Sequence, residues 1–205
     1  MASSTQSRTF VAELFGTFLL AFVVRTAIVH TMPIAIVPLL AAMTLGLCVY
    51  TLGPVSGCHI NPAITAGIYS VGKIRLPQAA LYLLAQVLGG FAAIALSYAV
   101  VRAPVNVTVE NSLGLLAFGE AIGMFVFSIG VASVVYGKTP AGAAGAVIGG
   151  SLLLGILIAS PFSSGVLNPA VALTLMPAPI AIYIIAPIVG SVAGFWFYRA
   201  LVGAK

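Results

Sequence analysis

The tripeptide Asn-Pro-Ala occurs twice in this 205-residue chain, first as Asn61, Pro62 and Ala63 and again as Asn168, Pro169 and Ala170. Asparagine is a strong helix N-cap and proline is favoured at the first helical position, so each copy predicts the start of a helix. Each following apolar run is too short to cross a membrane. Helix N-termini carry partial positive charge, and asparagine amides donate hydrogen bonds. Two such starts facing each other would bind a neutral polar molecule and repel a cation.

Hydrophobic residues make up 61% of the chain and charged residues 5%, and the mean hydropathy is +1.21. A soluble domain carries about 25% charged residues. The composition therefore predicts an all-α integral membrane protein, because the apolar runs are long and lack the alternation of a membrane β-barrel. The net charge is +5, but the eight basic residues form no patch, which excludes nucleic acid as a partner.

Six transmembrane helices are expected at about 9–29, 36–52, 76–101, 113–136, 141–159 and 180–202. Together they are expected to form a single transmembrane channel domain over residues 1–205. Two half-helices are expected to run from the Asn-Pro-Ala copies to about Gly72 and Met176. An irregular segment, at 53–60 and at 161–167, is expected before each half-helix. The chain thus needs six spans to position two short helices.

The two halves of the chain repeat one pattern. Glu13 and Glu120 are 107 residues apart, as are Gly16 and Gly123 and the two asparagines. The repeats are expected at about 9–101 and 113–203, each with three spans. Three is an odd number, so the second repeat enters the membrane from the other side. This inverted topology would bring both half-helix starts to the middle of the membrane.

The basic residues near the ends of the apolar runs predict the orientation. Basic residues favour the cytoplasmic side of a membrane. We expect the protein in the inner or plasma membrane, with both termini in the cytoplasm. Six basic residues then lie on the cytoplasmic side: Arg8, Lys73, Arg75, Lys138, Arg199 and Lys205. Arg25 and Arg102 fall outside.

Irregular backbone at membrane depth is tolerated where it lines a watery cavity or is buried in protein. The segments before the half-helices would present lines of backbone carbonyls, from Gly57, Cys58 and His59 and from Ser163 and Ser164. These lines lead to the two asparagine amides. A small molecule could pass its hydrogen bonds from carbonyl to carbonyl, which predicts selective conduction without a carrier cycle.

These features together resemble the aquaporin and glycerol-channel (major intrinsic protein) family. The stretch Ser56-Gly57-Cys58-His59-Ile60-Asn61-Pro62-Ala63 is similar to that family's Ser-Gly-x-His-x-Asn-Pro-Ala signature. The resemblance covers nearly the whole chain. It implies six tilted helices plus two half-helices in two inverted three-helix repeats, one pore per protomer, a homotetramer in the lipid bilayer, and no cofactor.

The departures from the family pattern concern its selectivity constriction. Most of the family has an arginine three residues after the second Asn, where this chain has Val171. Ile156 stands where water-specific members have histidine, and Gly165 is the third constriction position. The second span contributes Leu45, or Ala41 if no gap is placed before the first box.

A ring of these residues is apolar and lacks a cationic donor. By resemblance, the chain is therefore expected to be an unusual member of the family, of bacterial or archaeal type. Val171 and Gly165 are smaller than the residues they replace, which favours a wide ring. The expected function is a passive channel for water and small uncharged solutes, such as glycerol-like polyols and neutral metalloid hydroxides including arsenous acid.

Three other functions are compatible with parts of the sequence pattern. An ion- or proton-coupled transporter also uses broken helices and inverted repeats. A poorly conducting channel would result if the apolar ring stays dry. An enzyme is disfavoured, because three acidic residues and two histidines give no catalytic triad or metal-ligand set.

Four residues with reactive side chains have two interpretations each. Glu13 and Glu120 are either a proton relay or acceptors for backbone N–H groups of the irregular segments, and their symmetric placement favours the second role. His59 is either a gate that responds to pH or a packing residue beside the carbonyl line. Cys58 either borders the pore or is a small buried hydrophobe.

Overall fold

The computed structural model describes residues 2–30, 32–33, 36–100, 102, 105, 107 and 109–204, with side chains from Ser4 onward. The elements are α1 (Ala2–Val29), α2 (Ile36–Ser56), α3 (Pro62–Ser70), α4 (Leu76–Val100), α5 (Leu113–Val135), η1 (Ala141–Ala143), α6 (Ala144–Ala159), α7 (Pro169–Leu175) and α8 (Ile180–Leu201). Six of the described helices are long and apolar enough to cross a membrane, with η1 and α6 forming one of them. The predicted all-α class with six spans and short helices is confirmed.

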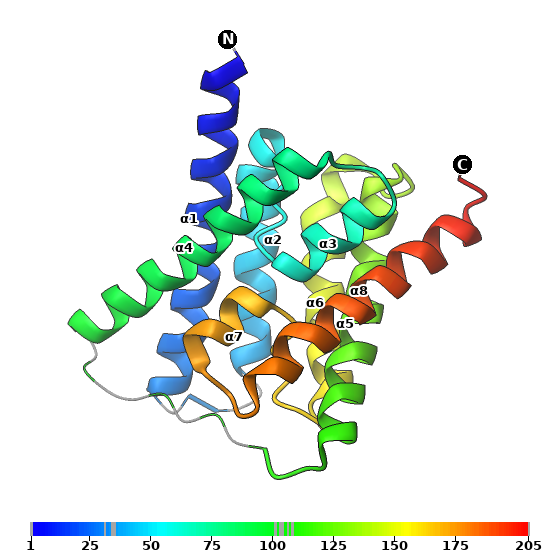
Figure 1. Ribbon diagram of the computed structural model, residues 1–205. Coiled ribbons are helices and arrows are strands. Elements are labelled where there is room, and N and C mark those ends of the chain that lie inside the picture. The colour runs from blue at the N-terminus through cyan, green and yellow to red at the C-terminus, as the bar shows by residue number, and fades with distance from the viewer. Residues whose placement is uncertain are drawn as a thin grey trace.

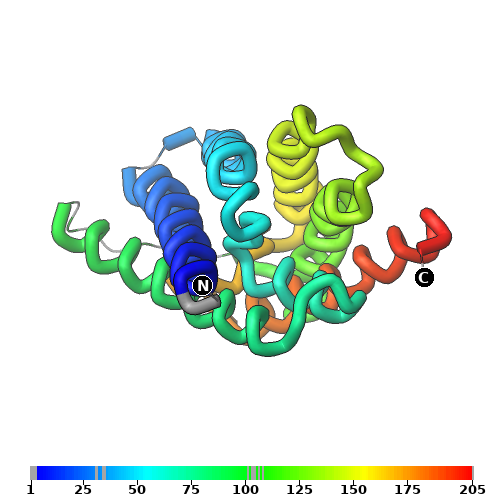
Figure 2. Tube along the Cα trace, turned by 90° about the horizontal axis from the view of Figure 1, so that it is seen from above, coloured from blue at the N-terminus to red at the C-terminus, as the bar shows by residue number. Residues whose placement is uncertain are grey.

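The half-helices α3 and α7 enter from opposite faces of the molecule, and their N-termini meet in the middle (Figure 1). We call the face where α1 begins the N-terminal face, and the face where α1 ends the opposite face. Each half-helix packs on the last long helix of the other half, α3 on α8 and α7 on α4. Seen from above, α1, α2 and α4 lie on one side and α5, α6 and α8 on the other (Figure 2). Contacts between α2 and α6 join the two sides.

One segment expected to be irregular is partly helical. Residues 53–56 continue α2, with Pro54 inside the helix, and the irregular stretch begins at Gly57. A proline close to a helix end removes one hydrogen bond and disturbs little of the helix beyond it. The Gly57 N–H still bonds to the Gly53 carbonyl at 2.8 Å. Helix continues because backbone groups at membrane depth need partners.

Arg25 is not an interfacial charge on the outer side of the membrane, in contrast to the expectation from the sequence. It lies one turn before the end of α1, and its side chain is 3% exposed. The guanidinium turns inward and donates a hydrogen bond from Nη1 to the Thr174 carbonyl of α7. Arg25 therefore contributes nothing to the charge count that orients the chain.

Glycines allow the closest helix crossings. A Cβ built on Gly89 would lie 2.4 Å from the Leu14 carbonyl oxygen, where α4 crosses α1. A Cβ on Gly190 would lie 2.2 Å from the Ala121 carbonyl oxygen, where α8 crosses α5. Small residues let backbones approach closely, and this packing holds membrane helices together. The crossings fix the frame around the half-helices.

Gly190→Ala should therefore destabilise the protein by about 1–3 kcal/mol, because the added methyl group cannot fit without separating α5 from α8. Thermal unfolding in detergent would show a lower midpoint. Gly150→Ala is the matched control, since a Cβ at Gly150 meets no atom within 4 Å. Equal midpoints for the two variants would contradict the close crossing.

Candidate functional site

Each Asn-Pro-Ala copy caps its half-helix through the asparagine side chain. Asn61 Oδ1 accepts hydrogen bonds from the backbone N–H groups of Ala63 at 2.8 Å and Ile64 at 3.4 Å. The backbone of Asn61 is extended, and Pro62 is the first helical residue. These bonds satisfy N–H groups that have no partner within the helix.

The second copy repeats the same capping geometry. Asn168 Oδ1 accepts from the N–H groups of Ala170 at 3.0 Å and Val171 at 3.4 Å, and Pro169 is the first residue of α7. Both half-helices thus begin with their N–H groups held by an asparagine oxygen. The amide nitrogens remain available for other partners.

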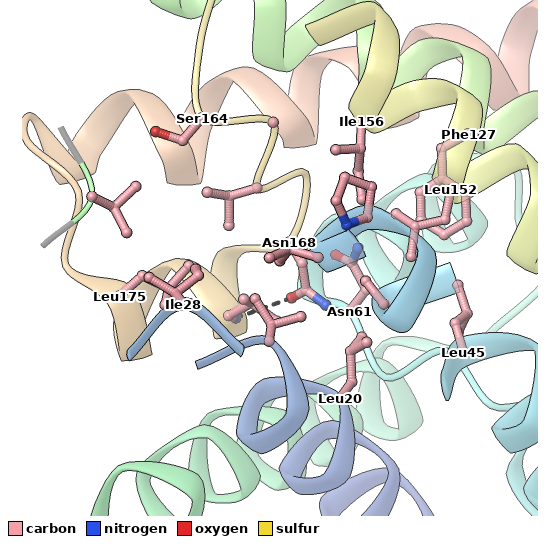
Figure 3. Close-up of a pocket in the computed structure, with 18 of the residues that line it drawn as sticks. Leu20, Ile28, Leu45, Asn61, Phe127, Leu152, Ile156, Ser164, Asn168 and Leu175 are labelled. Atoms are coloured by element: carbon pink, nitrogen blue, oxygen red, sulfur yellow. Dashed lines mark hydrogen bonds between the residues drawn. The ribbon is translucent and has the colours of Figure 1, made fainter. Parts of the chain in front are cut away.

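The two asparagine amides join the halves of the molecule. Asn61 Nδ2 donates to the Leu167 carbonyl at 2.9 Å, and Asn168 Nδ2 donates to the Ile60 carbonyl at 3.0 Å. An amide nitrogen carries two hydrogens, so each asparagine keeps a second donor. Both side chains line the central cavity, where they lie side by side (Figure 3). The site thus offers two adjacent N–H donors.

The Glu13 carboxylate holds the segment before α3. Its Oε1 accepts from the Ser56 hydroxyl at 2.7 Å and the His59 N–H at 2.9 Å. Its Oε2 accepts from the Ile60 N–H at 2.7 Å and Gln86 Nε2 at 2.8 Å. The side chain is 0% exposed. Four donors around a buried carboxylate satisfy both of its oxygens.

Glu120 does the same for the segment before α7. Its Oε1 accepts from the Ser163 hydroxyl at 2.8 Å and the Val166 N–H at 3.0 Å, and its Oε2 accepts from the Leu167 N–H at 2.8 Å. Each of these donors lies 107 residues after its counterpart around Glu13. The repeat therefore extends to individual hydrogen bonds.

These bonds hold a backbone that side chains rarely permit. Cys58, Ile60 and Leu167 have positive φ angles of 51°, 38° and 52°, and Gly165 has a φ of 60°. A branched residue such as Ile60 in this region is strained by about 1–3 kcal/mol. Its N–H is held by a glutamate and its carbonyl by an asparagine, so both sides of the strained residue are fixed.

A cavity of about 430 Å³ runs from the opposite face to the asparagine pair. Met32, Val107 and Val109 line its open end, and His59, Ile60 and Asn61 line its inner end. The structure brings all the predicted constriction residues to this cavity: Ala41, Leu45, Ile156, Gly165 and Val171. Of the predicted carbonyl line, His59, Ser163 and Ser164 belong to the lining, whereas Gly57 and Cys58 precede it toward the N-terminal face.

Several apolar lining residues escaped the sequence analysis. Leu20, Val24 and Ile28 of α1 line the cavity at a spacing of four residues, which is one helix face. Phe127 and Leu152 line it from the second half and lie 107 residues after Leu20 and Leu45. The repeat offset and the helical spacing were the signals that could have found them. Figure 3 shows Phe127 and Leu152 close to Asn61.

The His59 side chain is half-buried and contacts Thr65 and Tyr82. Its Nδ1 lies 3.2 Å from the Thr65 hydroxyl, and its ring contacts Tyr82 edge-on at 5.0 Å between centroids. Cys58 is 5% exposed and donates its N–H to the Ser56 hydroxyl at 3.0 Å. Among the described residues, no three His, Cys, Asp or Glu side chains gather into a candidate metal site.

Comparison with known proteins gives the family. The sequence profile of the family "Major intrinsic protein" matches residues 1–198. The chain is 33% identical to "Aquaporin NIP1-1" of Arabidopsis thaliana, over 93% of this chain and 72% of that protein. It is 30% identical to "Aquaporin Z" of Rhodopseudomonas palustris, over 94% of this chain and 92% of that protein.

A solved structure has the same fold. It is the "X-ray structure of the aquaglyceroporin from Plasmodium falciparum", with a TM-score of 0.76 and 24% identity, over 96% of this chain and 97% of that one. The family is one of membrane channels and is not enzymatic, so the protein is not an enzyme. The match of the family profile to almost the whole chain, together with this fold, shows that the protein belongs to the major intrinsic protein family of membrane channels.

Proposed function

We propose that the protein is a passive channel for water and small uncharged solutes, with glycerol-like polyols and neutral metalloid hydroxides such as arsenous acid as the solute class. The main support for this proposal is the uncharged cavity wall at Ile156, Gly165 and Val171. The described residues that line the cavity include no Lys, Arg, Asp or Glu. A solute that passes this wall must be uncharged.

Two features of the cavity support exclusion of ions. Removing even a neutral polar group from water without a partner costs about 2–7 kcal/mol, and an ion costs far more. At the inner end of the cavity two half-helices point their positive ends at the asparagine pair. A cation would lose its hydration at the apolar wall and then meet two positive dipole ends.

The polar groups of the cavity favour an amphipathic solute. Ser164 and the two asparagines offer hydrogen bonds, while α1 and α2 supply apolar side chains. Glycerol presents hydroxyl groups along one edge and carbon atoms along the other, which matches such a wall. The names of the relatives include aquaporins and an aquaglyceroporin, so they support both water and a polyol as cargo.

The same proposal covers assembly and orientation. We place both termini in the cytoplasm, because six basic residues then lie inside and Arg102 lies outside once Arg25 is recognised as buried. The open end of the cavity then faces the outside of the cell. A homotetramer and a bacterial or archaeal type follow from the family resemblance.

Between the two candidates on α2, the repeat favours Ala41 as the constriction residue. Leu45 and Leu152 are equivalent positions, so the inverted repeat places them on opposite sides of the membrane midplane. Ile156 is one turn beyond Leu152, on α6, toward the opposite face. On α2, which begins at that face, Ala41 is one turn nearer to it than Leu45. A ring with Ala41 is wider than one with Leu45.

Ala41→Phe should therefore lower glycerol permeability at least tenfold, because the ring side chain fills the constriction. Leu45→Phe is the matched variant and should lower it less than threefold. Glycerol-driven reswelling of liposomes, followed by light scattering, measures both. The reverse order would assign the constriction to Leu45.

An ion- or proton-coupled transporter is the alternative function. It differs from a channel in that its uptake rate depends on a proton or sodium gradient. Liposomes holding the protein would be tested for glycerol uptake with and without a proton or sodium gradient. A passive channel gives the same initial rate in both cases. A rate that depends on the gradient would contradict the proposal.

A further inference from the structure

Arg25 is a charged residue buried in the wall between α1, α4 and α7. Its Nη1 donates to the Thr174 carbonyl, and its guanidinium carbon lies 4.9 Å from the centroid of the Tyr98 ring. Its Nε and Nη2 atoms have no hydrogen-bond partner among the described residues. A buried guanidinium is costly, so its placement calls for a reason.

The C-terminal end of α7 needs a donor from outside the half-helix. The backbone of Met176 has the left-handed conformation, and its N–H donates a hydrogen bond to the Ala172 carbonyl at 2.8 Å. The Thr174 carbonyl is one of the last four of α7, and these carbonyls have no N–H partner within the helix. The Thr174 carbonyl takes its hydrogen bond from Arg25 instead, at the negative end of the helix dipole.

The other half-helix ends differently. After α3, the Gly72 N–H bonds to the Tyr69 carbonyl at 2.9 Å and the Lys73 N–H bonds to the Ile68 carbonyl at 3.1 Å. These backbone bonds close α3 without a side chain. The repeat counterpart of Arg25 is Ala132, which carries no donor in its side chain. The arginine is therefore specific to the half-helix that lines the open cavity.

A short path of bonds leads from Arg25 to the constriction. The Thr174 hydroxyl donates to the Val171 carbonyl at 2.7 Å, so the residue that Arg25 holds is bonded to Val171. Val171 lines the cavity. The residues one before and three after Arg25, Val24 and Ile28, also line it. Arg25 thus lies directly behind the wall that it braces.

We propose that Arg25 is a positioning residue for the outer constriction. It anchors the end of α7 from behind, keeps Val171 in place and so sets the size of solute that passes. This inference rests on the proposed function, since it assumes that the constriction at Val171 selects among neutral solutes.

The test compares Arg25→Met, Arg25→Lys and Thr174→Val in the full chain, reconstituted in liposomes, by the ratio of glycerol to water permeability. Arg25→Met should raise this ratio at least threefold, because an unanchored wall yields more to the larger solute. Arg25→Lys keeps the charge and a donor and should stay within twofold of the wild type. Thr174→Val retains the shape of the side chain but breaks the bond to Val171, and should raise the ratio.

Lys73→Met is the matched control. Lys73 follows α3 and lies over the Tyr136 ring at 4.9 Å, the same separation as between Arg25 and Tyr98. Its loss should leave the ratio unchanged, because backbone bonds close α3. An unchanged ratio in Arg25→Met and Thr174→Val, with wild-type conduction intact, would overturn the inference alone. A wild-type protein that passes no neutral solute would overturn the proposed function. Should Arg25→Met fail to fold, Arg25→Gln takes its place in the comparison, and an unchanged ratio in that variant would overturn the inference.

Discussion

Val171→Arg is expected to lower glycerol permeability at least tenfold and water permeability less than threefold. Val171 is in the first turn of α7, three residues after Asn168, and its side chain lines the cavity. An arginine there adds volume to the wall and places guanidinium donors in the path. A small molecule that hydrogen-bonds in single file tolerates this change better than a polyol. Stopped-flow light scattering of liposomes measures both permeabilities.

Val171→Leu separates the effect of volume from that of charge. Leucine adds bulk without donors, so it should lower glycerol permeability but less than arginine does. Equal losses of water and glycerol in Val171→Arg would show that the residue lies outside the constriction. The same outcome would remove the main support for a wide apolar ring.

Glu120→Leu should lower the free energy of unfolding by at least about 3 kcal/mol, since it leaves three buried donors without an acceptor at about 1–3 kcal/mol each. The donors are the Ser163 hydroxyl and the N–H groups of Val166 and Leu167. Leu167 would also lose the bond that holds its left-handed backbone. The expected result is a small yield of folded protein and a sharply lower midpoint of thermal unfolding in detergent.

The control for this change is Glu110→Leu, because Glu110 is exposed on the loop before α5. It should leave the midpoint within a few degrees of the wild type. Glu120→Gln also separates the two interpretations of this carboxylate. A proton relay predicts a folded protein that has lost a proton flux, whereas a backbone acceptor predicts reduced stability and no proton flux in the wild type either.

The sequence alone was enough for the fold, because membrane spans are long and apolar and the two Asn-Pro-Ala copies carry strong helix-start signals. It was not enough for the exact end of α2. Gly53 and Pro54 predicted a break, but the helix runs on to Ser56. Local propensity gave the wrong end there because backbone at membrane depth gains more from helical hydrogen bonds than a glycine and a proline cost.

The role of Arg25 could not be predicted from the sequence either. A basic residue four positions from the end of a span reads as an interfacial charge, and nothing local reveals that its partner is Thr174, 149 residues away. The need for that partner comes from the end of α7, where the last carbonyls have no N–H partner within the helix. Such a pairing depends on tertiary contacts between α1 and α7 and is invisible to a reading of each segment alone.

The most direct test of the central claim is one permeability series on the full chain in liposomes, for water, glycerol, urea and arsenous acid, without any ionic gradient. The proposal predicts that glycerol and arsenous acid enter faster than in protein-free liposomes, that water also passes, and that no current accompanies the flux. Rates equal to those of protein-free liposomes for every solute would contradict it.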